Sequence, residues 1–256
     1  MMKNDKIIII LGVAILIFAA IGVYYWVPQK ATAELVRTND FLDITGDLKD
    51  MPESITVSSQ DPFYPLIATP LAVNYDEAGE QMVIPLYVMD FNNPSTAIIR
   101  LQDQLARGKN GETIKDDESP KNASLRIAAN YWAHSEAALI IEYDEPGYDL
   151  GVIATPIASY LRIPVIVTDE IDADVTRVLN DLGVKKIIIC GSTLKGYGSV
   201  LKFNSVEEIV NASIVVVEEK LKHEINYITL TNPVDAWPPK ATASDRITGI
   251  IGRKRK

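Results

Sequence analysis

The sequence predicts an α/β fold, built from tandem α/β modules with mainly parallel sheets flanked by helices and preceded by one N-terminal transmembrane helix. Three observations support this prediction. Short apolar runs alternate with helical patterns, a motif recurs 86 residues apart, and an uncharged apolar segment lies near the start. With 256 residues, 47% of them hydrophobic, the chain can form a sizeable core, which excludes a disordered protein.

The N-terminal segment from Ile7 to Trp26 contains no charged residue. At ~1.5 Å per residue, a helix of this length spans ~30 Å, the thickness of the hydrocarbon core of a bilayer. We therefore expect residues 1–30 to form a cytoplasmic stub and an anchor. The protein would be a single-pass protein of the cell membrane, with its N-terminus inside and its body outside. The alternative is a signal peptide, with the body secreted after cleavage behind Ala33.

The charge of the chain excludes one class of partner. The formal net charge is −9, and residues 1–30 contribute +2, which leaves −11 on the remainder. Because a body this acidic repels phosphate backbones, we expect no nucleic acid partner. The single cysteine, Cys190, excludes a disulfide within the chain.

An internal repeat organises the body. Residues 66–72, Leu-Ile-Ala-Thr-Pro-Leu-Ala, return at residues 152–158 as Val-Ile-Ala-Thr-Pro-Ile-Ala, and the same offset relates Asp149 to Asp235. We expect a first, divergent α/β repeat over residues 31–115 and a second repeat over residues 121–200. Residues 201–256 would hold a partial third repeat and a basic tail.

The first repeat is predicted to contain strands at residues 55–58 and 82–88, with a turn at residues 76–80 between them. A helix is expected over residues 94–107, because Pro94 follows a capping asparagine. Residues 109–120 are polar and are predicted to be a linker.

The second repeat alternates more clearly between strands and helices. Strands are predicted at residues 138–142, 164–167, 186–190 and 227–231, and helices at residues 149–161, 172–182 and 205–223, with a turn at Pro146-Gly147. The strands are apolar on both faces, which is typical of a parallel sheet covered by helices on both sides.

This pattern resembles the cell wall-binding repeat 2 family of surface-protein modules. The residues that match are Ile140-Ile141, Asp149, Ala154 to Ala158, Ile163 to Thr168, Leu182-Gly183 and Ile187 to Gly191. The match covers about residues 121–191 well and residues 54–107 more weakly. The resemblance implies noncovalent anchoring to an anionic cell-surface glycopolymer through tandem modules.

Ligands bind beyond the carboxyl ends of the strands in a parallel sheet, so polar residues there are the candidate site. The candidate ligand or metal residues are Glu142, Asp144, Asp149, Thr168, Asp169, Asn232, Asp235 and Trp237. Their carboxylates could hold Ca²⁺ or Mg²⁺ through oxygen ligands, and no other cofactor is expected. The alternative is that the acidic residues cap the helices that follow the strands.

Repetition favours a non-catalytic binding or scaffolding protein at the cell surface, since tandem copies build an extended surface rather than one active centre. Its expected partners are the membrane and an anionic or glycan surface polymer or another surface protein. Two alternatives stay open: a divalent-metal-dependent ectoenzyme acting on phosphate or glycan, and a surface-layer component that self-assembles through residues 232–239. Outside the cell, Asn122 and Asn211 are candidate glycosylation sites.

Overall fold

The computed structural model describes residues 41–105 and 110–225, which all belong to one compact unit, Ala33–Lys256. None of the helices in these two ranges is long and apolar enough to cross a membrane. The predictions for the N-terminal anchor, the cleavage site, the strand at residues 227–231, the residues Asn232, Asp235 and Trp237, and the basic tail lie outside the described residues.

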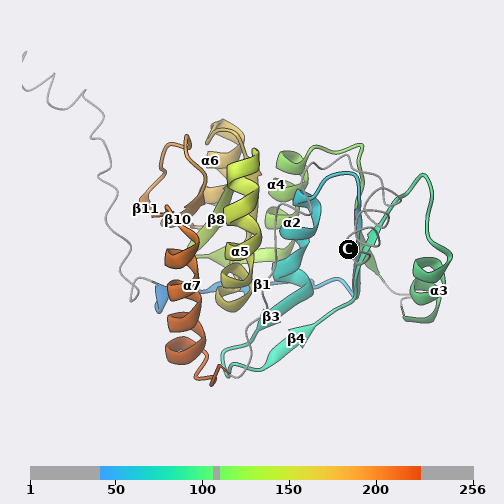
Figure 1. The fold of residues 1–256 in the computed structure, drawn as a ribbon, viewed down its shortest axis with the longest axis horizontal. Coiled ribbons are helices and arrows are strands. Elements are labelled where there is room, and N and C mark those ends of the chain that lie inside the picture. The colour runs from blue at the N-terminus through green and yellow to red at the C-terminus, as the bar shows by residue number, and fades with distance from the viewer. Residues whose placement is uncertain (1–40, 106–109, 226–256) are drawn as a thin grey trace, which may run out of the picture. The chain divides into compact units, whose positions relative to one another are not determined.

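Figure 1 shows the fold as a ribbon, coloured along the chain. The first sheet has three parallel strands in the order β5-β2-β6. The strands are β2 (Ser54–Ser58), β5 (Leu86–Met89) and β6 (Gly111–Ile114), and two helices connect them, α2 (Phe63–Ala72) and α3 (Thr96–Leu105). All five residues of β2 are buried, as expected for the central strand of a covered sheet.

The second sheet has four parallel strands in the order β11-β10-β8-β9. Its elements are β8 (Ala137–Glu142), α5 (Glu145–Leu161), β9 (Val165–Thr168), α6 (Ala173–Asp181), β10 (Lys186–Cys190) and β11 (Ser199–Phe203). Every residue of β8 and β9 is buried. The fold class is therefore confirmed as α/β with parallel sheets flanked by helices.

Both sheets follow one path. The chain runs up a central strand (β2 or β8), passes through a helix to a neighbouring strand, and returns through a second helix to the other side of the central strand. A further helix then follows in each half, α4 (Pro120–Tyr131) in the first and α7 (Val206–Val215) in the second. Ser119 and Ser205, which are 86 residues apart, are the N-caps of these two helices. We call β2 to α4 the first half and β8 to α7 the second half.

Short antiparallel pairs complete the fold. The strands β1 (Gly46–Leu48) and β7 (Trp132–Ser135) pair with each other, and β3 (Val73–Tyr75) forms a hairpin with β4 (Gln81–Val83). The indole of Trp132 is buried and donates a hydrogen bond of 2.7 Å to the backbone oxygen of Arg162. The two halves share one core, in which α2 packs against α5, and α2 and α4 cover the edge strand β9.

Three local predictions were wrong. The strand predicted over residues 82–88 is two strands in different sheets, β4 and β5, because Pro85 lacks the backbone N–H that would continue the first. Pro146-Gly147 is not a turn but part of the first turn of α5, where proline is tolerated. The predicted linker over residues 109–120 contains β6 and the start of α4. After α7 the chain continues as one π-helical segment, Val216–Lys220.

Candidate functional site

The carboxyl ends of β8 and β9 lie together, as the sequence predicts, because Glu142 and Thr168 are paired in neighbouring strands. Glu142 is buried, and its side chain reaches the loop after β10. One carboxylate oxygen accepts hydrogen bonds from the backbone N–H groups of Ser192 (2.6 Å) and Thr193 (3.0 Å), and the other accepts one from the Thr193 hydroxyl. Glu142 therefore holds two strand ends together from inside the fold.

The environment keeps this carboxylate ionised. Burial opposes ionisation of Glu142, but the hydrogen bonds from Thr193 and Ser192 outweigh it and lower the pKa of Glu142. The loop approaches so closely that Gly191, with a φ of +154°, has no room for a side chain. A Cβ atom there would lie 2.3 Å from the Glu142 carboxylate.

Two other predicted site residues, Asp144 and Thr168, bond to the backbone near them. Asp144 is the N-cap of α5 and accepts a hydrogen bond of 2.7 Å from the backbone N–H of Gly147. The Thr168 hydroxyl donates to the backbone oxygen of Glu170 at 2.7 Å, while Asp169 is exposed. Asp149 lies within α5, and one of its carboxylate oxygens is buried without a hydrogen-bond partner.

The structure also places an exposed tyrosine at this edge, between the two halves. Tyr143 directly follows β8, and its side chain is 41% exposed. Its hydroxyl donates a hydrogen bond of 2.6 Å to Asp61, which lies between β2 and α2. The Tyr143 ring packs against Phe63, the first residue of α2, at a centroid distance of 4.9 Å and an angle of 58°. The first turn of α2 thus supports a ring that comes from the second half.

Burial and the hydrogen bond to Asp61 raise the pKa of Tyr143, so the phenol stays protonated and continues to donate. The other oxygen of Asp61 accepts from the backbone N–H of Phe63 at 2.9 Å. Asp169 is close enough to contribute to the raised pKa of Tyr143. We call Asp61, Phe63, Tyr143 and Asp169 the tyrosine platform.

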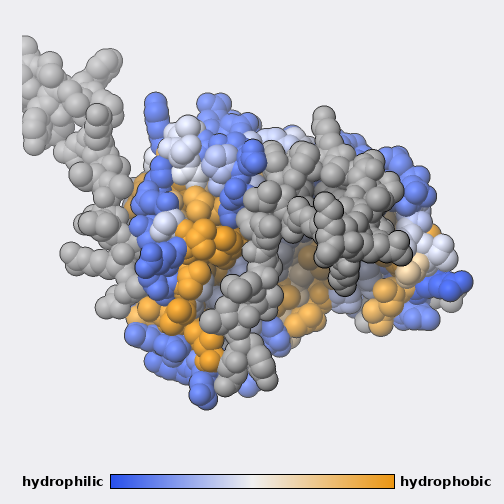
Figure 2. Space-filling model, in the orientation of Figure 1, coloured by the Kyte–Doolittle hydropathy of each residue, from blue (hydrophilic) through white to orange (hydrophobic). Residues whose placement is uncertain are grey.

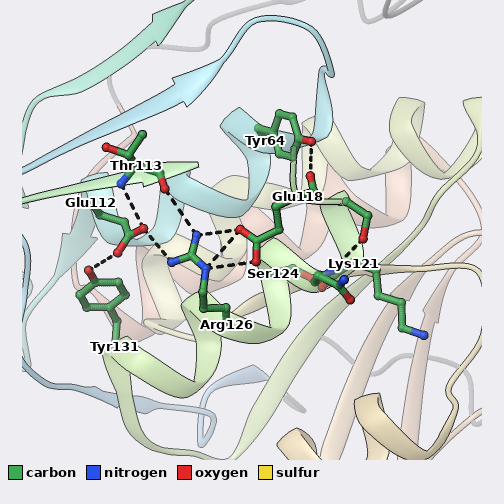
Figure 3. A network of polar contacts seen from close by, with 10 residues as sticks. Tyr64, Glu112, Thr113, Glu118, Lys121, Ser124, Arg126 and Tyr131 are labelled. Atoms are coloured by element: carbon green, nitrogen blue, oxygen red, sulfur yellow. Dashed lines mark hydrogen bonds and ion pairs between the residues drawn. The ribbon is translucent and has the colours of Figure 1, made fainter. Parts of the chain in front are cut away.

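A polar network surrounds β6 and the loop that follows it in the first half (Figure 3). Arg126 on α4 forms ion pairs with Glu112 at 2.8 Å and with Glu118 at 2.9 Å, and the Tyr131 hydroxyl donates to Glu112 at 2.5 Å. The hydrogen bonds from Arg126 to Glu118 raise the pKa of the guanidinium despite its burial. The Tyr64 hydroxyl donates to the backbone oxygen of Glu118 at 2.5 Å.

Burial, with nearby carboxylates such as Asp61, raises the pKa of Tyr64 to about 12. The network ties the loop after β6 to both α2 and α4. The network therefore positions this edge of the fold.

A separate pocket of about 400 Å³ lies between β1 and the β3–β4 hairpin. It is lined by Asp47, Leu48, Met51, Asn74, Asp76, Met82, Val83, Ile84 and Arg162. These residues come from the amino-terminal side of the sheets and from the connection after α2. The pocket is therefore distinct from the strand-end edge.

Sequence reasoning selected Asp169 of the tyrosine platform but missed Asp61, Phe63 and Tyr143, although a signal for them exists. Tyr143 and Asp61 both follow central strands, so the strand-end rule applied equally to both halves selects them. Within residues 41–105 and 110–225, no group of three or more His, Cys, Asp or Glu side chains is arranged to hold a metal ion. Of the glycosylation candidates, Asn122 on α4 and Asn211 on α7 are both exposed.

Comparison of the chain with family models, with curated proteins and with solved structures found no match. The resemblance to the cell wall-binding repeat 2 family therefore stays a prediction that depends on the sequence pattern.

Proposed function

We propose that the protein is a cell-surface binding module, tethered to the membrane by residues 7–26, and that it holds a surface glycan at the tyrosine platform. The observation that carries this proposal is the exposed ring of Tyr143, fixed by Phe63 beneath it and by Asp61 at its hydroxyl. A ring held in one position loses little conformational entropy when a ligand stacks on it.

The chemistry of the platform suits a hydroxyl-rich ligand. A tyrosine ring offers an apolar face to the C–H groups of a sugar, and carboxylates such as Asp169 accept hydrogen bonds from sugar hydroxyls. The body carries a net charge of −11, which disfavours direct binding of a polyanion. A neutral glycan, or an anionic glycopolymer bridged by Ca²⁺ or Mg²⁺, fits this surface.

The use of the neighbouring carboxylates supports binding over catalysis. Glu142 is engaged by three hydrogen bonds, and Asp144 caps α5. A carboxylate that holds the backbone in this way is a structural acceptor, while a general base must be free to take a proton from a substrate.

Binding to immobilised surface polysaccharides, neutral and anionic, tests the proposal with the unit Ala33–Lys256. We expect retention on at least one polymer and its loss in Tyr143→Ala, while Tyr143→Phe keeps the ring and retains part of the affinity. Val83→Ala removes an exposed side chain from β4, at 63% exposure against 41% for Tyr143, and serves as the control.

Repeating the assay with EDTA separates a neutral glycan from a cation-bridged polymer. Retention on no polymer, or retention that Tyr143→Ala leaves unchanged, contradicts the proposal. A metal-stimulated hydrolysis that disappears in Glu142→Ala favours the ectoenzyme alternative instead.

A further inference from the structure

The junction between the two halves shows how one half covers the next. Helices α2 and α4 of the first half pack against β9, the edge strand of the second sheet, and α4 also contacts α6. At its centre, the Ser124 hydroxyl oxygen accepts a hydrogen bond of 3.1 Å from the backbone N–H of Val167. Both residues are fully buried, with exposures of 0%. Lys121 of α4 forms an ion pair with Asp172 at the start of α6.

Among the described residues, the corresponding face of the second half stays exposed. Ser124 on α4 corresponds, 86 residues later, to Val210 on α7, whose side chain is 42% exposed. Pro120 is buried, whereas its counterpart Val206 is 47% exposed.

The positions on α2 and α5 that match across the 86-residue offset also differ in burial, with the residues on α5 more exposed. Ile67 and Pro70 of α2 are buried in the junction region, whereas Ile153 is only partly buried and Pro156 is exposed. Figure 2 shows apolar residues gathered over α5 and α7. We call this surface the α5–α7 face.

The complementary edge of the first half is also exposed within residues 41–105 and 110–225. Its edge strand β5 takes the place in the first sheet that β9 takes in the second. Val88 of β5, the counterpart of the buried Val167, is 43% exposed. The helix α3 has no buried residue, although α6, which follows β9 as α3 follows β5, buries three. Ile99, Leu101 and Leu105 are therefore exposed apolar side chains on α3, and we call this surface the β5–α3 edge.

We propose that a second copy of this chain docks head to tail, with the α5–α7 face of one copy on the β5–α3 edge of the other. The internal junction is the template, because the same pair of element types already packs there between the halves. A second copy fits because every chain carries both complementary surfaces, the α5–α7 face on its second half and the β5–α3 edge on its first half. Such heterologous contacts close into a ring or extend into a filament, depending on the rotation that relates one copy to the next. The proposal does not depend on glycan binding.

Cross-linking between single-cysteine variants tests the predicted pairing. The native thiol of Cys190 is fully buried, so it does not compete for the reagent. We expect a mixture of full-length Val210→Cys and Val88→Cys proteins in detergent to form a cross-linked dimer with a short thiol-to-thiol reagent. Val210→Cys alone should form none, because a head-to-tail contact does not bring two α7 helices together. Val83→Cys, at an exposed valine on the β3–β4 hairpin, mixed with Val88→Cys is the matched control.

Sedimentation of the full chain in detergent measures the assembly itself. We expect concentration-dependent association that Val210→Glu weakens by about tenfold or more, since it buries an unpaired charge in the contact, while Val83→Glu leaves it unchanged. A chain that stays monomeric at high concentration, or a Val210→Cys homodimer, overturns the proposal. Association that appears only after residues 226–256 are deleted overturns it as well, because that segment of the same chain would then be the occupant of the face.

Discussion

Glu142 is the residue whose role the structure defines most sharply, and replacing it with glutamine tests that role. The carboxylate accepts hydrogen bonds from two backbone N–H groups and one hydroxyl, of Ser192 and Thr193, in a buried position. A hydrogen bond to a charged group contributes ~1.5–3 kcal/mol, and a buried donor left without its partner costs ~1–3 kcal/mol. The glutamine keeps one acceptor oxygen and turns an NH₂ group toward a donor. We expect Glu142→Gln to lower the free energy of unfolding by about 2–4 kcal/mol at pH 7.

The pH dependence of this loss gives a second, independent readout. The pKa of Glu142 is lowered in the folded state, so its ionisation stabilises the fold above the ordinary value of 4.5 and the contribution is lost as pH falls through the folded-state pKa. The difference between wild type and Glu142→Gln should therefore shrink on going from pH 7 to pH 3.5.

Urea unfolding followed by circular dichroism measures both quantities. The control is Asp169→Asn, which removes an exposed carboxylate at the neighbouring strand end and should change stability by less than about 0.5 kcal/mol. A loss below about 0.5 kcal/mol for Glu142→Gln, or a loss that is the same at both pH values, would refute the assigned role.

Three further predictions follow from buried groups. Because the pKa of Tyr64 is raised from 10.0 to about 12, its contribution to folding stability is complete below pH 10 and is lost as pH rises toward 12. Tyr64→Phe should therefore flatten the alkaline decline of the unfolding free energy, and an identical decline would show that Tyr64 plays no part in it. Gly191→Ala should destabilise the fold by about 1–3 kcal/mol in urea unfolding, since the new Cβ meets the Glu142 carboxylate, and a neutral effect would mean that the loop shifts freely. Burial raises the pKa of the Cys190 thiol, so labelling by a thiol reagent should occur only at the rate of unfolding, and rapid labelling of the native protein would contradict its burial.

Much of the fold could be predicted because strands and helices are encoded locally. The isoleucine-rich strand at Lys186–Cys190 has the predicted bounds, and Asp172 caps α6 where the helix was expected to begin. The failures are also local in origin. Pro85 separates two strands that an apolar run had joined, and the polar composition of residues 109–120 concealed the strand β6.

The candidate site could be predicted only in part. The strand-end rule selected Glu142 and Asp144, and the capping alternative predicted the role of Asp144 at the start of α5. Neither predicted that the loop after β10 donates to the oxygens of Glu142. Whether a carboxylate faces solvent or a neighbouring N–H depends on the path of another segment, here the loop after β10. That information is not contained in the residues around Glu142.

The sequence by itself determined the α/β class, most of the strands and helices of the second half, and the correspondence between residues 66–72 and 152–158, because periodicity and capping act over a few neighbouring residues. Only the tertiary structure decided that Tyr143 meets Asp61, 82 positions away. It also decided that α4 covers β9, while Val206 and Val210 on α7 stay exposed among the described residues. Those outcomes depend on how α2 packs against α5, and packing between distant elements follows from the shape and burial of many side chains together.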